Sequence, residues 1–298
     1  MKFLKLIGFG HLLLLAFAQF IFKYGFLDYQ PGIILTLNDT YYAFLVLACV
    51  CIAAGGFLIT NITAHGSERY GLSESTAYYI YGGLTIGGLA LGYYISDYIE
   101  RPSFMMAFAI AVGTLYFYST NLRSSLLLGN LLIAFLIGFS VLVIGIFALF
   151  PVLSNITMRS ELSLLFTVIL DFAVFGAVIG LIVTLLNDLK NVDVDYNEGL
   201  NTLPIAIGRE RAGKVAFAVG IVAVGLIIYY INANLKELLW AMGYILLFVL
   251  GPIVYFIINI WSAKTSKEYG TLEVIMKAVL FFTALSVLII TLNMKYNA

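Results

Sequence analysis

The feature that most constrains this chain is a series of long apolar segments separated by short polar connections. Each segment is near the ~20 residues that a helix needs to cross a bilayer. Because the hydrocarbon core offers no water to backbone polar groups, such segments fold as helices. The pattern predicts an all-α, polytopic membrane bundle of about nine transmembrane helices, antiparallel where connections are short. The expected spans are Leu4–Phe26, Tyr41–Ala64, Thr76–Ser96, Pro102–Thr120, Leu126–Phe150, Ser163–Asn187, Ala212–Ile231, Leu235–Trp261 and Leu272–Leu292.

The composition excludes an ordinary water-soluble domain. Hydrophobic residues make up 62% of the chain, charged residues only 11%, and the mean hydropathy is +1.02. A chain with so few polar residues cannot cover the surface of a soluble globular domain. We therefore expect membrane lipid around the helices. The formal net charge is zero, which gives no indication of a nucleic-acid partner. The sequence does not predict an oligomeric state.

The densest acidic cluster follows the sixth apolar segment, in the stretch Asn187–Gly208. If the helix continues beyond Leu186, Asp188, Asn191 and Asp195 lie on one face, at positions i, i+3 and i+7. Oxygen ligands at the end of a membrane helix suit a hard cation such as Mg²⁺ and, through it, a diphosphate. The alternative is a solvated loop whose charges only keep the helix from sliding into lipid.

The second apolar segment ends in the same topological position, and its tail repeats the spacing. Asn61, Ala64 and Glu68 also stand at i, i+3 and i+7. This set offers a single carboxylate, and a cation site with fewer negative ligands binds more weakly. We expect the inner ends of the second and sixth helices to meet over one pocket.

The Lys and Arg residues predict the orientation of the bundle. With the N-terminus inside, 11 of the 16 Lys and Arg residues lie in inner segments, which follows the positive-inside rule. We therefore expect an integral protein of the cell (inner) membrane with the Asp188 cluster on the cytoplasmic side. There, soluble diphosphates and Mg²⁺ are available.

Both acidic segments resemble signatures of the UbiA family of intramembrane prenyltransferases. The second family signature reads D-x-x-D-x-x-x-D followed by a Gly and T-L-P; here Asn191 replaces the middle Asp, and Thr202-Leu203-Pro204 matches the tripeptide. The first reads N-D-x-x-D-x-x-x-D, and Asn61, Ala64 and Glu68 stand at its three Asp positions. The resemblance implies one UbiA-like domain over residues 1–298.

The resemblance also implies a set of site residues. The string YFYSTNLR at the end of the fourth span is similar to a family pattern whose basic residue contacts the diphosphate. The alternative is that Arg123 only adds to the positive charge of the inner segments and that the tyrosines lie at the membrane–water interface. The implied catalytic residues are Asp188, Asn191 and Asp195. The implied diphosphate contacts are Arg123, Tyr118, Asn61 and Lys190. The implied Mg²⁺ ligands are Asp188, Asn191, Asp195, Asn61 and Glu68.

For activity, the resemblance implies Mg²⁺-dependent transfer of a prenyl group from a polyprenyl diphosphate to a lipophilic acceptor. Acceptors across the family include quinone and other aromatic precursors, haem and glycerol lipids. Because the first signature has lost carboxylates, a rival interpretation is an impaired homologue that binds lipid or isoprenoid without turnover. A transporter is a second rival, but it would place polar residues through the depth of the spans. Here they gather at inner helix ends, with Asp171 the main exception.

Overall fold

The computed structural model describes residues 2–30, 32–33, 35–154 and 159–297, and in these residues every regular element is a helix. The predicted all-α fold is therefore confirmed. The helices divide into two compact groups. Unit 1 comprises Met1–Phe20, Pro31–Arg123 and Ser140–Leu170, and unit 2 comprises Ile21–Gln30, Ser124–Phe139 and Asp171–Ala298. The single domain expected from the sequence stays a prediction.

The long helices agree with most of the predicted spans. In the described residues, eight helical segments are long and apolar enough to cross a membrane. The third expected span, Thr76–Ser96, forms helix α4 (Glu74–Tyr98) of 25 residues, but this helix is not one of the eight. Its many Tyr, Gly, Ser and Thr residues lower its apolar character, so its role as a span stays a prediction.

The first predicted span is interrupted, because helix α1 (Lys2–Leu6) and helix α2 (Phe9–Gly25) are separate. Gly8 lies between them with a φ of +64°, a conformation that residues with a Cβ rarely adopt. A Cβ at Gly8 would also lie 2.7 Å from the ring of Phe57. The helix therefore breaks where only glycine fits.

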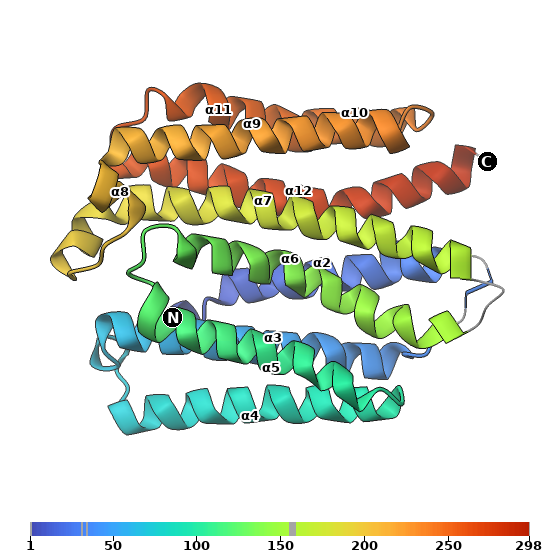
Figure 1. Cartoon of the computed structure of the whole chain (residues 1–298), viewed down its shortest axis with the longest axis horizontal. Coiled ribbons are helices and arrows are strands. Elements are labelled where there is room, and N and C mark those ends of the chain that lie inside the picture. Colours follow the sequence, from blue (N-terminus) through green and yellow to red (C-terminus); the bar gives the residue numbers. More distant parts are fainter. Residues whose placement is uncertain (1, 31, 34, 155–158, 298) are drawn as a thin grey trace. The chain divides into compact units, whose positions relative to one another are not determined.

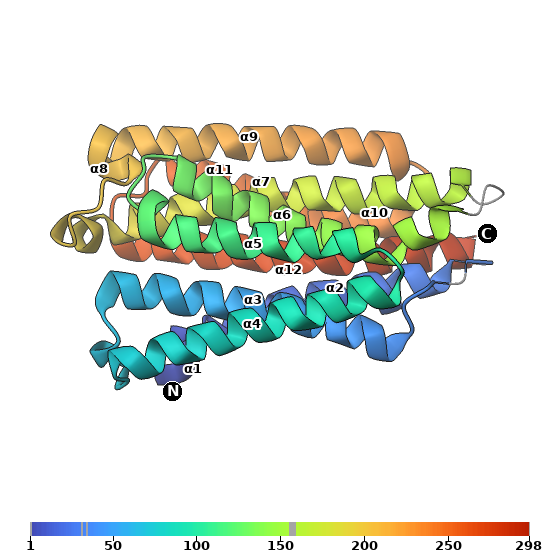
Figure 2. The ribbon, with the colours of Figure 1, turned by 60° about the horizontal axis from the view of Figure 1, so that its bottom comes forward.

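Unit 1 is built on the pair α3 (Asp39–His65) and α4, which run side by side (Figure 2). The approach is close, because a Cβ at Gly88 of α4 would lie 2.7 Å from the Ile52 side chain of α3. The other helical elements of the unit are α1, η2 (Glu68–Tyr70), η3 (Pro102–Phe104), α5 (Met105–Phe117), η4 (Tyr118–Leu122) and η5 (Phe150–Ser154), with parts of α2, α6 (Leu128–Ala148) and α7 (Arg159–Asn197).

Unit 2 contains the C-terminal helices, in which α9 (Arg209–Asn234) packs against α11 (Gly251–Ile260) and α10 (Leu239–Ile245) packs against α12 (Ser266–Asn297) (Figure 1). Gly220 of α9 allows the approach to α11, since a Cβ there would lie 2.9 Å from the ring of Phe256. The elements of this unit are η1 (Leu27–Tyr29), α8 (Leu203–Ile207), α9 (Arg209–Asn234), α10 (Leu239–Ile245), η7 (Leu246–Leu250), α11 (Gly251–Ile260) and α12 (Ser266–Asn297), with parts of α2, α6 (Leu128–Ala148) and α7 (Arg159–Asn197).

Candidate functional site

Helix α7 continues far past its predicted membrane span and carries the acidic cluster with it. It runs to Asn197, so the expected continuation beyond Leu186 is confirmed, and Asp188, Asn191 and Asp195 share one face. The helix stops at Gly199, which has a φ of +72°; the backbone N–H of Leu200 donates to the carbonyl of Asp195 at 2.9 Å. This is a glycine-terminated helix end. Asp195 is only 7% exposed.

The face of α7 that carries these residues is the face that packs on α6. Within unit 2, a Cβ at Gly138 would lie 2.5 Å from the carbonyl oxygen of Ala173, and one at Gly180 would lie 2.7 Å from Ile137. Later residues of α7 meet earlier residues of α6, so the two helices are antiparallel. Two turns further along, Asn130 in the first turn of α6 reaches Asp188: its Nδ2 donates to Oδ2 at 2.8 Å.

The sequence interpretation missed Asn130. It is 6% exposed and lies in an otherwise apolar segment, where a strongly polar residue is rare. A buried amide needs a partner, since leaving it unpaired costs roughly 1–3 kcal/mol. The isolated Asn in an apolar run was the available signal, but the sequence does not reveal its partner.

Lys190 has a different partner from the predicted diphosphate. It lies two residues after Asp188, about 200° around the helix, so it points to another face of α7. Its Nζ donates to Oε2 of Glu273 on α12 at 2.5 Å, and Lys277 Nζ lies 2.6 Å from the other carboxylate oxygen. The Glu273 side chain is only 5% exposed. A diphosphate contact by Lys190 would require this buried pair to break.

Asp193, another member of the acidic cluster, is part of a surface ion pair. Its Oδ2 accepts from the guanidinium of Arg209, the first residue of α9, at 2.8 Å, and its side chain is 75% exposed. Of the clustered carboxylates, Asp193 thus lies off the Asp188 face and ties the end of α7 to α9.

The helical face of Asn61 and Ala64 on α3 does not continue to Glu68, and the role of these residues as ligands stays a prediction. The helix ends at His65, and Gly66 follows with a φ of +73°. Glu68 therefore begins the short helix η2 and does not continue the face of Asn61 and Ala64. The Asn61 Nδ2 donates to the carbonyl of Leu6 at 2.8 Å, so this amide holds α1 in place.

The structure does join the α3 tail to the Tyr118–Arg123 segment of unit 1. The Thr60 and Ser119 hydroxyls lie 2.6 Å apart. Here α5 gives way to the wide π-helical turn η4, in which Arg123 N–H donates to the Tyr118 carbonyl at 2.9 Å. Single π turns occur often at functional sites. The tail of α3 and the Tyr118–Arg123 segment, which are far apart in the sequence, are therefore neighbours in unit 1. The predicted meeting of the α3 and α7 ends stays a prediction.

The donor set of α7 fits a hard cation better than that of α3. Asp188, Asn191 and Asp195 offer oxygens, and the α6 partner of Asp188 is a neutral amide that leaves its charge in place. On α3, the Asn61 Nδ2 donates to the Leu6 carbonyl, so Asn61 can offer a cation only its neutral Oδ1. In the described residues, no group of three or more His, Cys, Asp or Glu side chains is placed to hold a metal ion. An ion on α7 would rely on two carboxylates, amide oxygens and the diphosphate itself.

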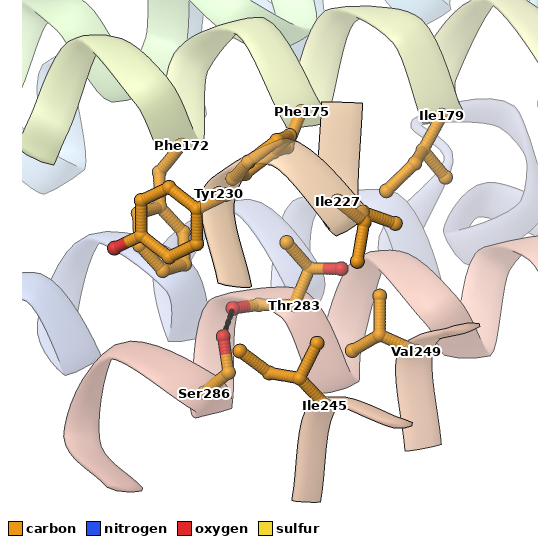
Figure 3. Close-up of a pocket in the computed structure, with 9 residues that line it drawn as sticks. All are labelled: Phe172, Phe175, Ile179, Ile227, Tyr230, Ile245, Val249, Thr283 and Ser286. Carbon is orange, nitrogen blue, oxygen red and sulfur yellow. Dashed lines mark hydrogen bonds between the residues drawn. The ribbon is translucent and has the colours of Figure 1, made fainter. Parts of the chain in front are cut away.

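Unit 2 also encloses a small apolar cavity of about 20 Å³ between α7, α9, α10–η7 and α12 (Figure 3). Phe172 and Phe175 line it, whereas their neighbour Asp171 does not. The Thr283 hydroxyl points toward Ile227 and Val249 (Figure 3), is buried, and has no hydrogen-bond partner in the described residues. Asp171, the polar exception among the predicted spans, is therefore not part of the cavity lining.

Replacing the Thr283 hydroxyl by a methyl group is expected to stabilise the protein. Thr283 is 7% exposed, and Thr283→Val keeps its shape while removing an unpaired polar atom. Unpaired buried hydroxyls cost roughly 1–3 kcal/mol, so the unfolding temperature should rise by about 2–5 °C. Thermal unfolding in detergent measures this shift. Thr291→Val is the control, because the Thr291 hydroxyl donates to the Val287 carbonyl at 2.8 Å and its loss should not stabilise. A lower unfolding temperature for Thr283→Val would show that the hydroxyl has a hydrogen-bond partner.

Comparison with solved structures shows a UbiA-like fold. A structure from work on digeranylgeranylglyceryl phosphate synthase in membranes has a TM-score of 0.65 and 16% identity, covering 96% of this chain and 98% of that one. A UbiA homologue from Archaeoglobus fulgidus, bound to DMAPP and Mg²⁺, gives 0.62 and 15%, covering 97% and 99%. An apo UbiA homologue from Aeropyrum pernix K1 gives 0.64 and 15%, covering 96% and 97%. No protein-family model and no curated protein matches the sequence.

Proposed function

We propose that this integral membrane protein is a UbiA-type prenyltransferase. It would move a prenyl group from a polyprenyl diphosphate to a lipophilic acceptor such as a quinone or other aromatic precursor, haem or a glycerol lipid. The observation that carries the proposal is the shared face of Asp188, Asn191 and Asp195 at the end of α7, in a chain with the UbiA fold. Solved UbiA homologues bound to DMAPP or GPP with Mg²⁺ support the substrate class.

In this proposal, Asp188, Asn191 and Asp195 are the catalytic residues and hold Mg²⁺ beside the diphosphate. An ion held by these residues would offset the negative charge that develops on the leaving diphosphate. Arg123 and Tyr118 bind the diphosphate, and a planar guanidinium suits phosphate oxygens well. Asn61 and Glu68 form a second, weaker ligand set. Apolar walls exclude water, which protects an allylic cation from hydrolysis until the acceptor attacks. We place the site on the cytoplasmic side of the cell membrane.

A second candidate is an impaired homologue that binds isoprenoid or lipid without turnover. Three observations favour it. Ala64 replaces a carboxylate of the family signature, Glu68 lies beyond the end of α3, and the Asn61 amide is bonded to the Leu6 carbonyl. Fewer carboxylates mean weaker ion binding, and Mg²⁺ gives up its water reluctantly.

The two candidates are separated by a turnover assay. The purified protein in lipid nanodiscs is incubated with Mg²⁺, a labelled prenyl diphosphate and a panel of acceptors. The enzyme predicts release of diphosphate and a labelled lipophilic product, both abolished by EDTA. The impaired homologue predicts retention of the labelled prenyl diphosphate without release. If the protein neither binds the prenyl diphosphate nor releases diphosphate, both candidates are contradicted.

Returning one carboxylate to α3 should raise turnover. Ala64 is partly exposed at the end of the helix, so Ala64→Asp adds a ligand without burying a charge in the core. Since changes to metal partners alter affinity or activity about 10- to 100-fold, we expect Mg²⁺-dependent diphosphate release to rise about tenfold. Ala263→Asp, which adds the same charge to the partly exposed connection before α12, is the control. Equal rates in both variants would argue against a metal site near Ala64.

A further inference from the structure

We infer that Asn130 is a positioning residue for Asp188, an inference that rests on the proposed function. The interaction is a direct side-chain contact between two helices of unit 2, with Asn130 Nδ2 donating to Asp188 Oδ2 at 2.8 Å. Asn130 is 6% exposed, so water does not compete freely for its amide. A hydrogen bond to an ionised group is stronger than one between neutral groups.

The position of Asn130 is fixed from both directions. It lies in the first turn of α6, where the backbone N–H of Gly129 donates to the Ser125 hydroxyl at 3.2 Å. Two turns later, α6 packs closely against α7, because a Cβ would not fit at Gly138 of α6 or at Gly180 of α7. The amide is therefore held at a set distance from the α7 backbone. A side chain held in this way can fix the rotamer of the carboxylate that it contacts.

The chemistry of the partner matters as much as its position. A Lys or Arg in place of Asn130 would neutralise Asp188, whereas an amide orients the carboxylate and leaves its negative charge for a cation. The adjacent cation, Lys190, is held on another face of α7 by Glu273. Neither Asn130 nor Lys190 therefore neutralises Asp188 through these contacts. Partners of this kind around metal ligands typically alter metal affinity 10- to 100-fold when they are removed.

The test is a double-mutant cycle with a metal readout. Binding of Mn²⁺, with and without inorganic diphosphate, is followed by electron paramagnetic resonance for the full-length wild type, Asn130→Leu, Asp188→Asn and the double variant. We expect Asn130→Leu to weaken Mn²⁺ binding at least about tenfold. In the Asp188→Asn background it should have little further effect, because Asn130 acts through Asp188.

The control is Asn293→Leu. Asn293 is also 6% exposed in unit 2, and its Oδ1 accepts from the backbone N–H of Ala241 at 2.9 Å. Both Leu variants lose a buried amide and should lose stability, but only Asn130→Leu should lose Mn²⁺ affinity. If Asn130→Leu does not fold, Asn130→Ser takes its place. For turnover, we expect Asn130→Leu to lower kcat with a smaller change in KM for the prenyl diphosphate at saturating Mg²⁺.

The outcomes separate this inference from the proposed function. Wild-type Mn²⁺ binding that is lost in Asp188→Asn but unchanged in Asn130→Leu would overturn the role of Asn130 and leave the proposed site intact. Equal losses in Asn130→Leu and Asn293→Leu would show that the effect is structural, and would also overturn it. Absence of Mn²⁺ binding by the wild type would overturn both the inference and the metal-dependent function.

Discussion

Replacement of Asp188 by Ala is expected to reduce Mg²⁺-dependent diphosphate release at least about 100-fold. Asp188 is the carboxylate that α6 holds through Asn130, and it leads the anionic face of α7. Loss of a direct ligand should cost at least as much as loss of a supporting partner, which typically costs 10- to 100-fold. The measurement is the initial rate of diphosphate release at saturating prenyl diphosphate, repeated over a range of Mg²⁺ concentrations.

Asp193→Ala is the matched control for this variant. Asp193 lies on the same helix but is 75% exposed and paired with Arg209, so its loss should alter the rate by less than about threefold. Asp188→Glu keeps the charge and should retain part of the activity, with a higher Mg²⁺ requirement. An Asp188→Ala variant that folds and works as well as Asp193→Ala would remove the α7 face from the mechanism.

Replacement of Glu273 by Ala is expected to lower the free energy of unfolding by about 3 kcal/mol, since removing one partner of a buried ion pair typically costs 3–5 kcal/mol. We take the lower end because Lys190 and Lys277 are each 31% exposed. The side chain of Glu273 is 5% exposed and contacts both lysines, so its loss leaves two partly buried cations beside each other. Denaturant unfolding in mild detergent measures this loss.

The control pair has the same spacing but lies at the surface. Glu210 and Lys214 are four residues apart on one helix, as Glu273 and Lys277 are. Their Nζ–Oε1 distance is 2.8 Å, but the Glu210 side chain is 84% exposed. Breaking this pair with Glu210→Ala should cost less than about 1 kcal/mol. If the two variants are equally stable, burial does not strengthen the Glu273 cluster and α12 is not held to α7 by it.

Much of the fold was predictable from the sequence because lipid imposes one rule on every span. An apolar segment in hydrocarbon must satisfy its own backbone, so its length and hydropathy predict a helix. The rule did not predict the break at Gly8. There the backbone has a positive φ and the Phe57 ring leaves no room for a Cβ. It also placed the mixed segment of α4 among the spans, although its composition is less apolar than that of the eight others.

The site was predictable only where it depends on one helix. The shared face of Asp188, Asn191 and Asp195 follows from helical periodicity once α7 continues to Asn197. Glu68 does not share a helical face with Asn61, because α3 ends before it, at Gly66. Contacts between helices have no local signal. For that reason, the partners of Asp188 and Lys190, which are Asn130 and Glu273, emerged only from the structure.

The length of α7 has a consequence for how the protein tolerates its membrane. At about 1.5 Å per residue, its 39 residues extend roughly 58 Å, against a hydrocarbon thickness of about 30 Å. Bilayers differ in thickness by only a few ångströms, and helices adapt by tilting. The surplus of α7 is far larger than that, so its acidic end stays at the aqueous boundary in thin and thick bilayers alike. Exposed carboxylates at this end, such as Asp193, then keep access to water and to dissolved ions without any adjustment of the helix.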